Sequence, residues 1–503
     1  MPKSPGNLGV LTPEVHGSVA RNVYGIGSSL STMPTFYIEQ FGCRATQADG
    51  AAIERQLREQ GCQLVSGAQA ADVVVLNTCT VTAAADTQAR DAIRKLQAAN
   101  PATRIIVTGC YAQRAPEELA ALPGVSFVVG NSHKPQIPNL LRSIAPFPLL
   151  SVPVAAQHAT PHLARLPDSE GSPAQAIILT GDIFDLTEVL VAPVLGGEGN
   201  HTRPTLKIQD GCNARCSFCV IPFVRGKSRS LPPGKVVAEV QRLADSGYRE
   251  IVLSGINLGA YGRDLSPRVA FLDLLHRILD ETPVERLRVS SIEPLDVTLS
   301  LIDLIASTGR LAPHFHMPLQ SASDRILAAM HRWYRAEHYA RRVELIHERL
   351  PHAAIGADVI TGFPGETETD HAATLRFIEE RPFTYLHVFS YSPRPGTKAA
   401  ALPNQVPGSV IKRRAHELRA LAETKSAEFR ASQIGRILRV LTLRRDPEDD
   451  PCFTPALSEN YLSVQLPLTL PPNQLLTASI TRTEGKNLCA LPLEPVLAAS
   501  EAG

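Results

Sequence analysis

Three cysteines stand close together near the middle of the chain, in the order Cys212, Cys216 and Cys219. Their C-x3-C-x2-C spacing lets three thiolates bind one face of a cubane 4Fe–4S cluster, which leaves the fourth iron without a protein ligand. Structural zinc is the alternative, but zinc takes four closed ligands, and no fourth Cys or His lies within ten residues of these three. The spacing therefore predicts an iron–sulfur cluster with one open iron.

Three further cysteines, Cys43, Cys79 and Cys110, are far apart in the sequence. A lone thiol of this kind is usually a buried core residue. Each of these three, however, follows the end of an expected strand, where ligands collect in open parallel sheets. Gly42 and Gly109 precede two of them, and glycine lets the backbone approach a bulky group. We therefore expect a second cluster site here, and interpret the remaining cysteines as structural: Cys62, Cys452 and Cys489.

The first part of the chain alternates between strand-like and helix-like segments. This alternation predicts an open parallel α/β sheet with covered faces over residues 34–143. Residues 1–33 are interpreted as a flexible extension, because they are rich in Gly, Ser and Pro and show no periodicity. Strands are expected at 35–41, 71–76, 104–108 and 125–129, and helices at 47–59, 83–99 and 116–122.

A second alternation follows residue 203 and contains six strand–helix units. We expect a partial (β/α)6 barrel over residues 202–431, which ends in a long polar helix at 407–431. Strands are expected at 205–209, 250–253, 286–290, 314–317, 355–360 and 385–390, and helices at 233–246, 271–281, 323–331, 336–350 and 369–380.

Two regions do not follow this alternation. Residues 144–201 are rich in Pro, Ala and Leu and are interpreted as an insertion or linker, in which 175–183 and 188–195 stay open between strand and loop. Residues 432–495 hold short apolar strands separated by turn signals, which predicts a small all-β barrel. The expected fold class is therefore α/β, with an all-β domain at the C-terminal end.

Composition limits the partners only weakly. The 503 residues exceed one ordinary core, and the formal net charge of +1 identifies no partner. No run of eighteen apolar residues and no signal-peptide stretch are present, so we expect a cytoplasmic protein without a membrane span. Positive charge concentrates between Ile411 and Arg445, which hold ten Lys or Arg against three Glu. Such a run is usually a solvated helix face, but before a small barrel it favours contact with RNA phosphates.

The motifs resemble those of one known family. The run from Gly211 to Pro222 resembles the SAM-cluster loop of the radical S-adenosylmethionine (SAM) methylthiotransferases. The dispersed cysteines resemble that family's auxiliary-cluster domain, and the C-terminal strands resemble its RNA-binding TRAM domain. Three runs are similar to the branch that acts on N6-threonylcarbamoyladenosine in tRNA, although residues 44–47 stand where Lys and Asn are more usual: 254–262, 330–334 and 387–392.

This resemblance implies two 4Fe–4S clusters and SAM as cofactors. The cluster on Cys212, Cys216 and Cys219 would bind SAM and release a 5′-deoxyadenosyl radical, which would take the hydrogen from C2 of the adenine at position 37, next to the anticodon. A radical is needed because an aromatic C–H offers no acidic proton. The other cluster would carry the methylated sulfur to C2. Alternatives are an isopentenyladenosine in tRNA, an aspartate of a ribosomal protein, or a non-enzymatic iron–sulfur RNA-binding sensor.

The resemblance also implies partners and further site residues. The partners are the tRNA anticodon loop, an electron donor such as flavodoxin or ferredoxin, and a sulfur donor, and we expect a monomer. Barrel ligands lie at the carboxyl ends of strands, so six residues are expected at SAM: Ser254, Gly255, Ser291, Glu293, Gln320 and Gly362. Gly362 belongs to the stretch 362–366, for which a structural explanation is equally good: Gly365-Glu366 turns the chain and caps the helix expected from residue 369. Five basic residues are expected at the RNA: Arg332, Lys412, Arg413, Arg436 and Arg439. For Arg332, a helix end with a cationic last turn is an equally good structural explanation.

Overall fold

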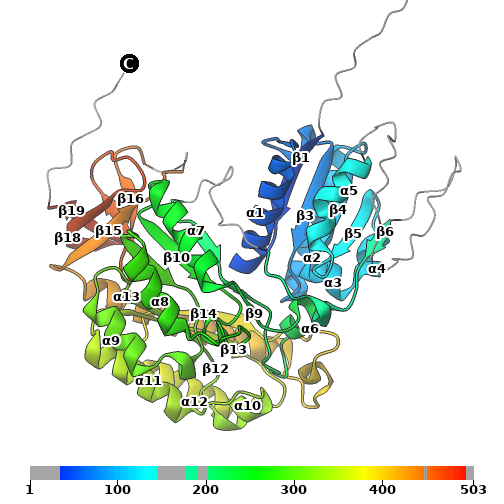
Figure 1. The fold of residues 1–503 in the computed structure, drawn as a ribbon. Coiled ribbons are helices and arrows are strands. Elements are labelled where there is room, and N and C mark those ends of the chain that lie inside the picture. Colours follow the sequence, from blue (N-terminus) through cyan, green and yellow to red (C-terminus); the bar gives the residue numbers. More distant parts are fainter. Residues whose placement is uncertain (1–33, 145–175, 191–201, 447, 449, 494–503) are drawn as a thin grey trace, which may run out of the picture.

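The computed structural model describes residues 34–144, 176–190, 202–446, 448 and 450–493. Figure 1 shows three units in chain order: an α/β sheet unit in blue to cyan, a central unit in green to yellow, and a small all-β unit in orange. The expected extension at 1–33 and most of the expected linker at 144–201 lie outside the described residues. No described helix is long and apolar enough to cross a membrane.

The N-terminal unit is a parallel sheet with the strand order β2-β1-β3-β4-β5-β6. Helix α2 packs on one face of the sheet, and α1 and α5 pack on the other, each burying an apolar stripe. The expected open α/β sheet is confirmed. Its elements are β1 Thr35–Gln40, α1 Arg44–Glu59, β2 Gln63–Leu64, β3 Val73–Thr78, α2 Ala83–Ala99, β4 Arg104–Gly109, α3 Cys110–Arg114, α4 Pro116–Ala120, β5 Val125–Gly130, α5 Ile137–Ile144 and β6 Ile177–Leu179.

Strand β6 comes from the stretch that the sequence analysis interpreted as a linker. It pairs in parallel with β5, with Phe127 opposite Ile177, and so forms one edge of the sheet. The N-terminal unit therefore takes a strand from beyond its expected boundary at residue 143. A run of three strand residues is too short to show a clear periodicity, which is why the sequence left it open.

The central unit is an open barrel of six parallel strands. Its two sheets, β7-β10-β11 and β12-β13-β14, are joined by bridges from Leu287 to Leu311 and from Ser291 to His316. The expected partial barrel is confirmed. Its elements are β7 Thr205–Lys207, β8 Gln209–Asp210, α6 Ile221–Arg225, β9 Arg229–Ser230, α7 Pro233–Asp245, β10 Glu250–Ser254, α8 Phe271–Glu281, β11 Arg286–Val289, α9 Leu299–Ser307, β12 His314–Gln320, α10 Asp324–Ala329, α11 Ala336–Arg349, β13 Ala354–Thr361, α12 Glu368–Glu379, β14 Tyr385–Ser390 and α13 Gly408–Ala431.

The C-terminal unit is a closed five-stranded barrel with its own apolar core, as expected. It docks on the central unit through buried arginines of β11. Arg286 donates to the carbonyls of Arg439 and Leu457, and Arg288 donates to those of Ser458 and Glu459. The strands are β15 Ile437–Thr442, β16 Thr454–Ser458, β17 Ser463–Leu466, β18 Leu475–Glu484 and β19 Asn487–Pro492.

Candidate active site

The dispersed cysteines meet at one edge of the N-terminal sheet. Cys79 and Cys110 directly follow β3 and β4, and Cys43 lies three residues after the end of β1. These three strands are neighbours in the sheet. Gly42 has a φ of +104°, and a Cβ on it would lie only 2.8 Å from Cys79 Sγ. Gly109 has a φ of +101°, and a Cβ there would lie 2.6 Å from the Thr78 nitrogen. Both glycines are therefore needed for the close approach of these loops.

The surroundings of these thiols fit a bound cationic group. Burial and the neighbouring Cys110 raise the pKa of the Cys79 thiol to about 11. Cys43 Sγ lies 3.6 Å from Thr46 Oγ1, and Asn131 Nδ2 lies 3.6 Å from Cys110 Sγ. Thiols that suppress each other's ionisation become thiolates when a cationic iron centre binds them.

The second cysteine set lies in the loop between β8 and α6. Burial, followed by the adjacent Cys216 and Cys212, raises the pKa of the Cys219 thiol to about 12. The Ala214 amide donates to Cys212 Sγ at 3.4 Å, and Arg332 Nη1 donates to Cys216 Sγ at 3.2 Å. Nitrogen donors directed at sulfur are typical of cysteines that bind iron–sulfur clusters.

The spread of the sulfurs argues against zinc. Tetrahedral zinc with Zn–S bonds of about 2.3 Å needs sulfurs about 3.8 Å apart. Within the described part of the chain, neither cysteine set has its three sulfurs within 4.8 Å of one another, whereas His316, Asp358 and His387 do meet that limit. The cysteine sets therefore fit a multi-iron cluster better than one zinc ion.

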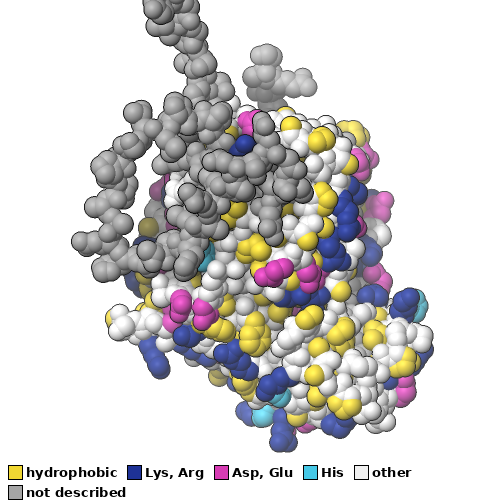
Figure 2. All heavy atoms as spheres, turned by 90° about the vertical axis from the view of Figure 1, so that its right-hand side faces the viewer, with side chains coloured by type: hydrophobic (Ala, Val, Ile, Leu, Met, Phe, Trp, Pro, Cys, Tyr) yellow, Lys and Arg dark blue, Asp and Glu magenta, His cyan; other side chains and the backbone are white. Residues whose placement is uncertain are grey.

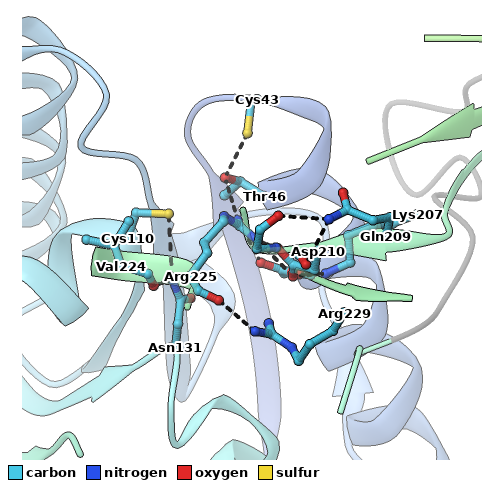
Figure 3. Close-up of polar contacts among 12 residues, drawn as sticks. Cys43, Thr46, Cys110, Asn131, Lys207, Gln209, Asp210, Val224, Arg225 and Arg229 are labelled. Atoms are coloured by element: carbon cyan, nitrogen blue, oxygen red, sulfur yellow. Dashed lines mark hydrogen bonds and ion pairs between the residues drawn. The ribbon is translucent and has the colours of Figure 1, made fainter. Parts of the chain in front are cut away.

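A buried group of charges ties the two cysteine loops together (Figure 3). Arg225, at the end of α6, donates to Asp49 of α1 at 3.0 Å and to Asp210, just before the central cysteine loop, at 2.9 Å. Lys134 donates to Asp49 at 2.8 Å, and Lys207 pairs with both carboxylates. Burial alone would raise the pKa of Asp49, but the cations Lys134, Lys207 and Arg225 outweigh it and hold that pKa well below its ordinary value.

This group has three cations against two carboxylates, and the excess charge lies near sulfur. Arg225 interacts electrostatically with Cys110 and Cys43 as well as with the two carboxylates. A positive charge beside thiolates offsets the negative charge that a cysteine-bound cluster brings into a buried site. The arrangement therefore suits the first set of cysteines as cluster ligands.

Both sets of cysteines border the same region. Val220 and Val224 of the α6 segment pack on Cys110, so the helix that follows the central cysteine loop also forms a wall of the auxiliary site. A cavity of about 240 Å³ is lined by Cys219 and by Val81 and Thr82, which closely follow Cys79. The sequence could not place these two loops together, because they lie in different units.

The residues expected at SAM fall into different places. Glu293 lines a cavity of about 460 Å³ beside the central cysteine loop and pairs with Arg332, and burial raises the pKa of Glu293. Gln320 has a φ of +65° and lines the cavity that contains Cys219. Ser291 forms a bridge to His316 in the barrel wall.

The other three lie at the carboxyl ends of the barrel strands β10 and β13. Ser254 is buried at the end of β10. A Cβ on Gly255 would lie 3.0 Å from Gln209 Oε1, so this glycine makes room for Gln209. A Cβ on Gly362 would overlap Ile411 of α13, which gives that glycine a packing role. Their expected contact with SAM stays a prediction.

The residues expected at RNA also lie in different places in the structure. Lys412 and Arg413 are exposed on α13, although Arg413 pairs with Glu368 and Glu417. Arg436 contacts His352 at 2.6 Å, and Arg439 donates to the Gly309 carbonyl at 2.6 Å, so both join the C-terminal barrel to the central unit. The Arg332 side chain is directed at Cys216 and Glu293, and its expected contact with RNA stays a prediction.

The sequence analysis missed three residues that the structure brings to the site. Arg225 and Asp49 belong to the charged group, and Asp358 lines the cavity with Cys219. The available signal was a charged residue on an otherwise apolar segment, as for Arg225 after the run from Ile221 to Val224. Such residues are seldom buried without a partner.

Known proteins match the regions that hold the two cysteine sets. Residues 35–130 match the uncharacterized protein family UPF0004, and residues 206–378 match the radical SAM superfamily. The chain is 37% identical to the threonylcarbamoyladenosine tRNA methylthiotransferase MtaB of Aquifex aeolicus, over 85% of this chain and 95% of that protein. The protein of the same name in Bacillus subtilis is 35% identical, over 86% and 90% of the two chains.

A second group of relatives carries a different substrate in its name. The tRNA-2-methylthio-N(6)-dimethylallyladenosine synthase of Thermobifida fusca is 34% identical, over 92% of this chain and 90% of that protein. Both groups match along most of their length and include both cysteine-bearing regions. The chain belongs to the radical SAM methylthiotransferase family.

Proposed function

We propose that this chain adds a methylthio group to C2 of N6-threonylcarbamoyladenosine at position 37 of tRNA. The observation that carries the proposal is that the loops of the two cysteine sets meet at one cavity, which is lined by Cys219 and by Val81 and Thr82, shortly after Cys79. The relatives from Aquifex aeolicus and Bacillus subtilis, named for this substrate, support the choice of nucleoside.

The cofactors are SAM and two 4Fe–4S clusters, held by Cys212, Cys216 and Cys219 and by Cys43, Cys79 and Cys110. Bound there, they supply a carbon radical and a methylated sulfur, as replacement of an aromatic C–H requires. The protein orients and shields them. Arg332 holds the central cysteine loop through Cys216 and Glu293, and the apolar residues Val220 and Val224 exclude water between the two sites.

The target base must leave its stack to reach this cavity. Phe389, whose side chain is exposed, lines the cavity and offers a surface for base stacking. The exposed Lys412 and Arg413 on α13 are proposed to contact phosphates. The proposal also includes an electron donor such as flavodoxin or ferredoxin, a separate sulfur donor, and action as a cytoplasmic monomer.

Mass spectrometry of tRNA nucleosides tests the substrate. Cells without the gene should lose 2-methylthio-N6-threonylcarbamoyladenosine, and the unmethylthiolated nucleoside should accumulate. Return of the wild-type gene should restore the product, whereas a Cys216→Ala gene should not. Loss of the isopentenyl derivative instead would assign the other substrate of the family to this chain.

A further inference from the structure

One face of the sheet β12-β13-β14 carries a connected row of polar rings. Tyr385 Oη lies 2.7 Å from His314 Nε2 and 3.0 Å from His316 Nδ1. His316 Nε2 in turn lies 3.0 Å from Asp358. A Cβ on Gly356 would overlap the Tyr385 ring, so glycine on the middle strand lets this ring lie between the two histidines.

The row begins at the reaction cavity. Asp358 lines the cavity that contains Cys219, and His387 also contacts this carboxylate, at 3.3 Å. Burial alone would raise the pKa of Asp358, but hydrogen bonds from His316 and His387 hold that pKa well below its ordinary value, so the carboxylate is ionised.

The other end of the row is the place where all three units meet. Tyr461 of the C-terminal barrel stacks on His314, with ring centroids 4.4 Å apart. Arg44 of α1 donates to Tyr461 Oη at 3.3 Å. Arg44 directly follows Cys43, so this end of the row also adjoins the auxiliary cluster site.

Positive charge dominates at this end. Arg203, Arg286 and Arg288 share the single carboxylate of Glu250. Within the described part of the chain, Arg44 has no carboxylate within ion-pair distance, and its hydrogen bond to Tyr461 uses one of its five N–H donors. Burial, and then Arg288, lowers the pKa of His314 well below its ordinary value, so this ring stays neutral.

We propose that Arg44, with the Tyr461 hydroxyl, binds the carboxylate of the threonylcarbamoyl group on the target adenosine. A half-buried guanidinium with free donors in a positive environment is suited to one carboxylate. The ring row connects this anion site to the cavity where the adenine reacts. This inference rests on the proposed function. It makes Arg44 a specificity residue, which favours a substrate with a charged N6 substituent over one with an apolar isopentenyl group.

A backbone phosphate of the same RNA is the other possible anion, and binding measurements separate the two. The full-length protein with both clusters and SAM is titrated, without oxygen, with three anticodon stem–loop RNAs. These carry N6-threonylcarbamoyladenosine, unmodified adenosine or isopentenyladenosine at position 37. The wild-type protein is expected to bind the threonylcarbamoyl RNA more tightly than the unmodified one.

Arg44→Gln should reduce that preference about tenfold or more, the size expected for a lost charge-assisted contact, and leave binding of the unmodified RNA unchanged. Arg44→Lys should keep part of the preference. Arg58→Gln, on the exposed side of the same helix, is the matched control and should keep all of it. Equal weakening of all three RNAs by Arg44→Gln would identify a phosphate contact, and an unchanged preference would also overturn the proposal.

Two measurements keep the outcome clear. Iron is counted in each variant, and if Arg44→Gln loses iron, Tyr461→Phe carries the test, because it removes only the hydroxyl beside Arg44. It should reduce the preference about tenfold, as for one hydrogen bond to a charged group, and no reduction would overturn the proposal. The reaction product of the wild-type protein is measured separately. Methylthio transfer to the isopentenyl RNA alone would contradict the proposed function. The binding result for Arg44→Gln tests only the anion site.

Discussion

The Arg332 side chain links a cysteine of the central loop to a carboxylate of the barrel. Its guanidinium donates to Cys216 at 3.2 Å and pairs with Glu293, and the whole side chain is buried. The sequence analysis expected Arg332 among the basic residues at the RNA. Its burial makes it a positioning residue for the cysteine loop, since one guanidinium can bind a sulfur and a carboxylate together.

Single cysteine substitutions should separate the two sites. Cys216→Ala should abolish SAM cleavage, whereas Cys79→Ala should spare cleavage to 5′-deoxyadenosine and lose methylthio transfer. Each variant should keep about four of the eight irons expected for two cubane clusters. Chromatography of the cleavage products and iron analysis check this. Equal loss of cleavage in both variants would contradict the assigned roles, and Cys452→Ala, an exposed cysteine, is the control.

At the scale of elements, α6 and the strand ends do most of the positioning. Helix α6 has only five residues, yet its segment packs on Cys110 and its last residue, Arg225, enters the charged group. The connections after β1 and β3 have three and four residues, and α3 begins at Cys110 directly after β4, so each cysteine is held close to a rigid strand. Short connections leave little conformational freedom, which suits a site that must hold large cofactors at fixed places.

Gly42→Ala should damage the auxiliary site. The added methyl group would collide with Cys79, and alanine is strained at a φ of +104°. We expect a loss of about 1–3 kcal/mol in the free energy of unfolding and about half of the bound iron. Thermal unfolding and iron analysis measure both. Gly67→Ala is the control, because a Cβ there meets nothing within 4 Å, and normal iron content in Gly42→Ala would contradict this account.

At the scale of the whole molecule, the three units are joined by buried charge and not by apolar surface alone. The group around Asp49 connects the N-terminal sheet to the barrel, and the arginines around Glu250 connect the barrel to the C-terminal unit. In Figure 2, exposed Lys and Arg side chains are interspersed with Asp and Glu over the visible described surface, as the formal net charge of +1 suggests.

Asp49→Asn should loosen the contact between the two cluster-bearing units. It would leave Lys134, Lys207 and Arg225 with one carboxylate, and removal of one partner from a buried ion pair costs about 3–5 kcal/mol. Thermal or urea unfolding measures the loss. Asp91→Asn, whose exposed pair with Arg94 contributes little, is the control, and equal stability of the two variants would contradict the structural role of Asp49.

The same carboxylate predicts a dependence of stability on pH. Because the folded pKa of Asp49 is held below its unfolded value of about 3.9, its contribution is fully present at neutral pH and declines as the pH falls below about 4. The stability of the wild-type protein should therefore fall more steeply in this range than that of Asp49→Asn. Urea unfolding at pH 7, 5 and 3.5 checks this, and parallel slopes would exclude Asp49 as the source.

The sequence by itself determined the elements and the cysteine sets, because periodicity and residue spacing are local properties. The main strands of the sheet and barrel and most of their long helices were predicted to within a few residues, and Cys43, Cys79 and Cys110 were placed at the right strand ends. Helices α3, α5, α6 and α9 were not among the expected elements. Only the tertiary structure decided that Arg225 lies beside Asp49, that Arg332 is buried at Cys216, and that Arg44 meets Tyr461. The first and third of these contacts join different units, and the second joins segments 116 residues apart within the central unit. Their geometry follows from tertiary packing, which no local pattern encodes.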